Sequence, residues 1–142
     1  MDFHCKTHSL LDSMLPISTT KECYSTHFLD EFTVVHYVNG IAIKLLLPSI
    51  TDREVLLSAA GFEIIENNPA YINNFYADGI YKGDSLLNSI SDILVFYLGV
   101  ELTKKSSTIK KNKNKSLLGI VGINALMRII DEKKAKRLEG VY

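Results

Sequence analysis

The chain has 142 residues, of which 46% are hydrophobic and 23% are charged, and its formal net charge is zero. This length suits a single domain spanning residues 1–142, and this composition excludes a disordered chain. The zero net charge hides an asymmetry, because residues 1–99 carry five Lys or Arg against twelve Asp or Glu, whereas residues 100–142 carry eleven against four. Such a split bears on partners or on internal ion pairing rather than on the fold.

No segment has the pattern of a signal peptide or of a membrane span. The start of the chain lacks the positive charges and the apolar run of a signal peptide. The apolar stretch from Ile93 to Val100 is shorter than the roughly 20 residues that a bilayer requires. Asn124 and Arg128 interrupt the stretch from Leu117 to Ile130. Because two cysteines also make no disulfide framework, we expect a soluble, cytoplasmic protein that contacts no membrane.

The clearest predicted element is a β-hairpin over residues 31–47. Two segments rich in β-branched and aromatic residues, Glu31–Val38 and Ile41–Leu47, flank Asn39-Gly40. This dipeptide favours a type I′ turn, which needs positive φ at both central positions. Pairing across the turn predicts one apolar face, formed by Phe32, Val34, His36, Val38, Ile41, Ile43, Leu45 and Leu47.

A short helix and a third strand are predicted next. Thr51-Asp52-Arg53-Glu54 has the pattern of a capping box, and Gly61 supplies a C-terminal stop for the helix that it starts. Phe62–Glu66 then has the composition of a strand. Residues 70–83 allow either a second hairpin that turns at Asp78-Gly79 or a helix.

Two further helices and a loop complete the prediction. Asp84 caps a helix over about residues 85–98, and the last helix covers about residues 117–138. Between them, residues 104–115 are predicted to form a flexible Lys-rich loop. The predicted fold class is therefore α+β, with a small antiparallel sheet made of the hairpin and the third strand and with helices packed on one face.

Cysteine and histidine occur together near the N-terminus, as Cys5, His8, Cys23 and His27. Thiolate and imidazole groups at such spacings can share one tetrahedral Zn²⁺. The alternative is two unrelated Cys and His pairs, because short motifs often match by chance. His36 is interpreted as a structural histidine of the apolar face, since a functional role would need a nucleophile or a carboxylate beside it.

The sequence contains no P-loop, no Gly-rich dinucleotide motif and no nucleophile elbow, so no cofactor is expected and the charged surfaces carry the functional prediction. We expect a non-enzymatic protein-binding module of the immunity or inhibitor type, which masks a basic partner such as a nuclease toxin through an acidic face. The candidate partner-binding residues are Asp30, Glu31, Glu63, Glu66 and Asp78. Ordinary solubilising charge is the alternative explanation for these carboxylates.

A nucleic-acid-binding or regulatory protein is the alternative function. It would bind phosphates through the basic end of the last helix, Lys133–Arg137, and through six loop lysines. These lysines are Lys104, Lys105, Lys110, Lys111, Lys113 and Lys115. The loop has no interleaved aromatic residue, so simple solvation also explains it. A third possibility is an enzyme, which a pocket holding His36 or the Cys/His residues beside a carboxylate would support.

Overall fold

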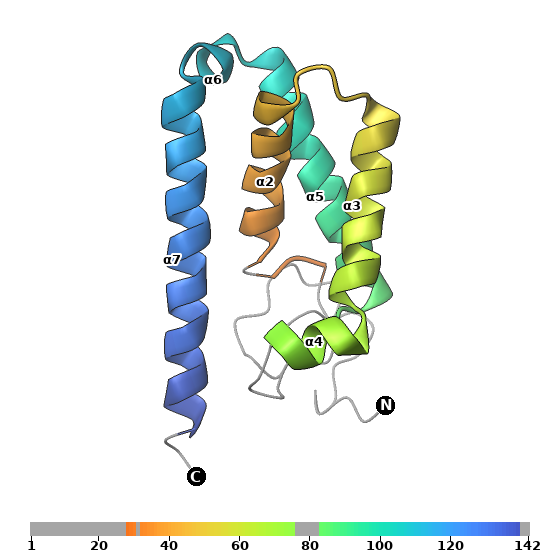
Figure 1. The fold of residues 1–142 in the computed structure, drawn as a ribbon, viewed down its shortest axis with the longest axis vertical. Coiled ribbons are helices and arrows are strands. Elements are labelled where there is room, and N and C mark those ends of the chain that lie inside the picture. The colour runs from red at the N-terminus through yellow and green to blue at the C-terminus, as the bar shows by residue number, and fades with distance from the viewer. Residues whose placement is uncertain (1–27, 31, 76–82, 140–142) are drawn as a thin grey trace.

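The computed structural model describes residues 28–30, 32–75 and 83–139 (Figure 1). These residues form helices and no strand. The helices are α2 (Thr33–Leu46), α3 (Asp52–Glu66), α4 (Pro69–Phe75), α5 (Leu86–Lys105), α6 (Ser107–Lys111) and α7 (Lys113–Glu139). The long helices α2, α3, α5 and α7 run alternately up and down, and the short helices α4 and α6 lie in the connections at opposite ends.

The prediction of an α+β fold is wrong. The predicted hairpin over residues 31–47 is α2, with Asn39 and Gly40 in the middle of the helix. The predicted strand over residues 62–66 is the C-terminal end of α3. The described part of the chain therefore has no sheet for the helices to cover. The preference of β-branched residues for strands is weak, and packing against other helices overrides it here.

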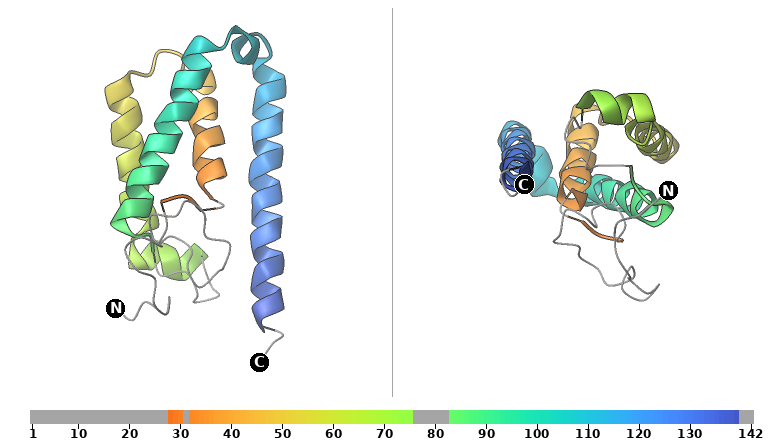
Figure 2. Two further views of the ribbon diagram at one scale, coloured as in Figure 1. Left: turned by 180° about the vertical axis from the view of Figure 1, so that it is seen from behind. Right: turned by 90° about the horizontal axis from the view of Figure 1, so that it is seen from below.

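Two glycines lie where α2 and α5 cross, and they explain how the helices approach each other. A Cβ atom on Gly40 would overlap the carbonyl oxygen of Phe96, and a Cβ atom on Gly99 would overlap that of Tyr37. Both glycines are buried. Small residues of this kind let two helix backbones come into contact. Gly40 therefore serves a helix–helix contact rather than a turn, and α2 lies between α5 and α7 in the end-on view of Figure 2.

Side-chain caps start α3 and α5. The capping box predicted at Thr51 is confirmed, because Thr51 Oγ1 accepts a hydrogen bond from the Glu54 N–H (3.3 Å) and Glu54 Oε2 accepts one from the Thr51 N–H (2.8 Å). α5 is capped by Ser85 rather than by Asp84, since the Ser85 hydroxyl accepts a hydrogen bond from the Asn88 N–H (3.2 Å). These bonds satisfy N–H groups that have no partner within the first turn of a helix.

The helices extend beyond their predicted ends. α3 continues through Gly61, and α5 continues through Gly99. The segment 104–115, which was predicted as a loop, is helical in the end of α5, in α6 and in the start of α7. A helix, α4, begins at Pro69, so the start of residues 70–83 follows the helical alternative.

The buried face of α5 is mostly polar, and large apolar residues are exposed on several helices, although Val38, Leu45, Val55 and Val100 are buried in the core. On α5, Asn88, Asp92 and Thr103 are at most 2% exposed. The opposite face of this helix carries leucine or isoleucine at every fourth position, exposed by 39% to 79%: Leu86, Ile90, Leu94, Leu98 and Leu102. Exposed apolar residues on α3 and α7 include Leu57, Ile64, Ile65, Leu118, Val121, Leu126 and Ile129. The distribution on α5 is the reverse of that in a helix at the surface of a water-soluble protein.

α5 is the one helix of the described ranges that is long and apolar enough to cross a membrane, by its 20 residues and its composition. Asn88, Ser91 and Asp92 shorten its apolar run in the sequence, which is why the sequence indicated no span. In the bundle these three residues are buried. Asn124, which interrupts the apolar stretch of α7, has a hydrogen-bond partner on a neighbouring helix, because its Nδ2 donates to Asn39 Oδ1 of α2 (3.1 Å).

Gly40→Ala should destabilise the protein by about 1–3 kcal/mol, because the added methyl group must push α2 away from α5. Gly61→Ala is the matched control, since its Cβ would have no atom within 4 Å beyond its chain neighbours and the adjacent backbone of its own helix. That change should be neutral or should stabilise by up to about 1 kcal/mol, as alanine favours the helix. Thermal unfolding followed by circular dichroism measures both, and equal stability of the two variants would contradict the close crossing.

Candidate functional site

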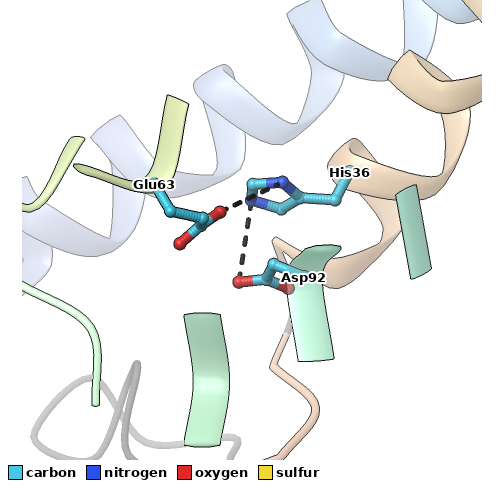
Figure 3. Close-up of side chains that lie close together, drawn as sticks. All are labelled: His36, Glu63 and Asp92. Atoms are coloured by element: carbon cyan, nitrogen blue, oxygen red, sulfur yellow. Dashed lines mark ion pairs between the residues drawn. The ribbon is translucent and has the colours of Figure 1, made fainter. Parts of the chain in front are cut away.

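Three ionisable side chains from three helices meet inside the bundle (Figure 3). They are His36 on α2, Glu63 on α3 and Asp92 on α5, and we call them the His–Glu–Asp cluster. His36 Nδ1 lies 3.9 Å from Glu63 Oε1, and His36 Nε2 lies 3.7 Å from Asp92 Oδ2. One ligand-type atom of each residue lies within 4.8 Å of the other two. The imidazole ring is therefore placed between two carboxyl groups.

The cluster is shielded from water. The side chains of His36, Glu63 and Asp92 are 13%, 7% and 2% exposed. Among the ion pairs of the described residues, none joins Glu63 or Asp92 to a Lys or Arg. Burying a carboxylate without a cationic partner is costly, so the site favours either a bound cation or protons on its carboxyl groups.

Asp30 and Thr33 support the cluster from the start of α2. Asp30 Oδ1 accepts hydrogen bonds from the N–H groups of Phe32 (2.8 Å) and Thr33 (3.0 Å). Thr33 Oγ1 accepts one from the Asp30 N–H (3.0 Å) and lies 3.5 Å from Asp92 Oδ1. Burial raises the pKa of the Asp30 carboxyl, and its hydrogen bond from the Thr33 N–H opposes this shift. One Asp92 oxygen thus lies beside Thr33 and the other beside His36.

A cavity of about 590 Å³ lies beside the cluster. All three residues of the cluster line it, and most of the remaining wall is apolar: Ala42, Ile43, Leu46, Leu47, Ala59, Phe62, Ile93 and Phe96. Phe62 packs edge-on to the His36 ring, with the ring centroids 6.3 Å apart. Because Leu46, Leu47 and Phe62 are exposed, the cavity opens onto the apolar surface of the bundle.

Comparison with known proteins places the chain in a family without an assigned function. The family described as protein of unknown function (DUF2585) matches residues 4–130. The chain belongs to this family. A curated relative, the UPF0314 protein of Paracoccus denitrificans (strain Pd 1222), is 36% identical in an alignment 92 residues long, and the match covers 57% of this chain and 48% of the relative. The chain thus spans about half the length of this curated relative. No solved structure matches the chain.

The six lysines predicted to bind phosphate gather at one end of this DUF2585 protein, where α5, α6 and α7 meet (Figure 1). We call this region the lysine end. Lys104 already forms two ion pairs there, through its Nζ with Asp52 and Glu101. The same Nζ lies 5.5 Å from the centroid of the Tyr97 ring. The exposed Lys110 donates through Nζ to the Lys104 carbonyl oxygen (2.9 Å). Binding of nucleic acid by these lysines stays a prediction.

The acidic residues predicted to bind a partner are largely turned away from solvent where the structure describes them. Asp30 and Glu63 are buried, and Glu66 is partly buried. Glu31 and Asp78 lie outside the described residues. Binding of a protein partner by these five acidic residues stays a prediction. The structure places Glu63 beside His36, a position that the sequence did not indicate.

The predicted metal ligands Cys5, His8, Cys23 and His27 lie outside the described residues. His36, interpreted as a structural histidine of a strand, instead belongs to a helix and faces two carboxyl groups. The signal that could have found the cluster is an ionisable residue within each apolar segment, because such residues are rarely buried without a partner. Because the sequence predicted strands around His36 and Glu63, it did not indicate that these residues would meet Asp92.

Proposed function

We propose that this DUF2585 protein is a membrane-embedded helical bundle that binds an amphiphilic ligand in the cavity beside the His–Glu–Asp cluster. The observation that supports membrane embedding is the reversed polarity of α5, with its apolar face exposed and its polar face buried. Lipid tails would cover the apolar face, while the polar face turns inward toward the neighbouring helices. In water this surface would be unfavourable, because full burial of one such side chain stabilises by about 1.5–3 kcal/mol.

The dimensions and charges of the bundle fit this environment. A helix of 20 residues such as α5 is about 30 Å long, which matches the hydrocarbon thickness of a bilayer. The lysine end lies where α5 finishes, so its side chains would reach the headgroup region. A second cavity, of about 450 Å³, is lined there by Lys44, Lys104, Lys110 and Lys113. Such a basic lining suits the anionic headgroups of lipids.

The first cavity indicates the class of ligand. Its exposed rim, at Leu46, Leu47 and Phe62, is apolar, so a ligand would enter from the hydrocarbon region. Its buried part holds the three ionisable groups of the cluster. Pockets with apolar walls and a few convergent polar groups bind small molecules and orient them. The ligand therefore has an apolar chain and a polar end group that meets the cluster.

This proposal departs from the expected soluble, cytoplasmic protein of the immunity type. That expectation depended on acidic residues acting as an exposed face, whereas Asp30 and Glu63 are buried. The buried carboxyl groups and the exposed leucines are explained together if the bundle lies in lipid. Ionisable residues within a membrane are costly, and they commonly mark functional sites.

Single tryptophan residues test the membrane embedding, because the chain contains no Trp. Leu94→Trp places a reporter on the exposed face of α5, and Ser107→Trp places one at the lysine end. In lipid vesicles the Leu94→Trp fluorescence should be shifted to shorter wavelength and quenched by brominated acyl chains, since its indole lies among lipid tails. The Ser107→Trp fluorescence should instead be quenched by acrylamide in the water. Quenching of both variants by acrylamide alone would contradict the proposal.

Filling the cavity tests ligand binding. Ala42 lines the cavity, whereas Ala125 is exposed on α7, so Ala42→Phe and Ala125→Phe form a matched pair. We expect protein purified in mild detergent to retain an amphiphile that solvent extraction and mass spectrometry detect. Ala42→Phe should reduce the retained amount roughly tenfold, which corresponds to about 1.4 kcal/mol, and Ala125→Phe should not. Equal amounts in the two variants, or none in the unaltered protein, would reject the ligand proposal.

A further inference from the structure

We infer that the His–Glu–Asp cluster binds one divalent transition-metal ion, and that Zn²⁺ suits its donors best. His36 offers an imidazole nitrogen, and Glu63 and Asp92 each offer a carboxylate oxygen. Zn²⁺ accepts this combination of nitrogen and oxygen ligands, whereas Ca²⁺ and Mg²⁺ prefer oxygen ligands alone. Three protein ligands leave one coordination position open, as in zinc sites that bind a further molecule.

The three residues of the cluster lie near enough for one ion to bind them once their side chains rotate. Ligand atoms held at about 2.0–2.2 Å from a tetrahedral Zn²⁺ lie about 3.4 Å from one another. His36 faces Glu63 through Nδ1 (3.9 Å) and Asp92 through Nε2 (3.7 Å). One ion would bind only one of these nitrogens, so one carboxyl group must turn toward the nitrogen that binds. All three ligand atoms lie within 4.8 Å of one another, a separation that rotation of the carboxyl side chains can reduce.

A cation would also compensate the buried acidic groups. Glu63 and Asp92 are buried, and among the described residues their recorded ion pairs are with His36. Glu63 Oε2 is itself buried and has no hydrogen-bond partner in the described part of the chain. Buried carboxylate oxygens in native proteins nearly always have a partner. A divalent ion between the helices would supply that partner together with the positive charge.

The surroundings of Asp92 favour a ligand role. Its Oδ1 lies 3.5 Å from Thr33 Oγ1, and Thr33 is held by Asp30, so Oδ2 is the oxygen directed to His36. Residues that fix the orientation of a metal ligand contribute strongly to metal affinity. Asp30 and Thr33 are therefore positioning residues for the metal site.

Metal binding by the cluster is independent of the proposed function. The identity of the molecule at the open coordination position rests on that function. Because the cluster lines the cavity, the polar end of the amphiphile would lie beside the ion. Phosphate and carboxylate end groups bind divalent cations through anionic oxygens, and we assign the end group of the amphiphile to this class. The metal thus specifies the amphiphile class further, although the ion itself can bind without any amphiphile.

The test measures Zn²⁺ binding to the full chain purified in detergent, by competition with a chromophoric chelator. We expect one Zn²⁺ per chain, and the same affinity when Cys5→Ser and Cys23→Ser remove both thiols. Glu63→Gln and Asp92→Asn keep the side-chain shapes and should each weaken binding roughly hundredfold, since even residues that only orient a ligand contribute about 10–100-fold. Zn²⁺ should also raise the unfolding temperature of the unaltered protein and not that of these variants.

Glu101→Gln is the matched control, because it removes a carboxylate from α5 at the lysine end. It should leave the Zn²⁺ affinity unchanged. His36→Gln provides an additional ligand variant if one carboxyl substitution prevents folding. Unchanged affinity in the folded cluster variants, or loss of zinc only on Cys5→Ser and Cys23→Ser, would overturn the inference.

Failure of this inference and failure of the proposed function give different results. If Zn²⁺ does not bind while Ala42→Phe still reduces the retained amphiphile, the metal site is rejected and the proposed function stands. If Zn²⁺ binds as expected and no amphiphile is retained, the metal site is supported and the amphiphile is rejected.

Discussion

The contact between the α2 and α5 backbones at Gly40 and Gly99 determines how the rest of the bundle is arranged. His36 lies one helical turn before Gly40, and Asp92 lies two turns before Gly99, so the crossing brings both residues to the same side of the contact. α3 packs on α5 and adds Glu63 to them. Apart from Val100, the buried face of α5 carries small and polar residues, and six leucine and isoleucine side chains of this helix are exposed.

This reversed polarity links the fold to the proposed function. An apolar exterior requires an apolar solvent, and a polar interior requires that each buried group has a partner. Helix–helix contacts supply some partners, as in the hydrogen bond between Asn124 and Asn39. The carboxyl groups of Glu63 and Asp92 have only His36 as an ion-pair partner among the described residues. The cluster is therefore the part of the interior that a bound ion would complete, and the cavity beside it gives a ligand access from the lipid side.

The sequence predicted the features that depend on local interactions. The capping box at Thr51 and the positions of helices near residues 85–98 and 117–138 are correct, because caps and helical spacing act over a few residues. The hairpin was wrong because the turn preference of Asn39-Gly40 is local, whereas Gly40 instead packs closely against α5 within a helix. The cluster could not be predicted, since its members are brought together by contacts between three helices. Glu63 was assigned to an exposed acidic face for the same reason.

The most direct test of the account is whether the unaltered protein is an integral component of the membrane. Membranes from cells that produce the chain can be washed with alkaline carbonate, which releases peripheral proteins, and then extracted with a mild detergent. The reversed polarity of α5 predicts that the protein stays in the washed membranes and is released as a folded helical protein only by detergent. Recovery of the folded, monomeric protein in aqueous buffer without detergent would contradict the account.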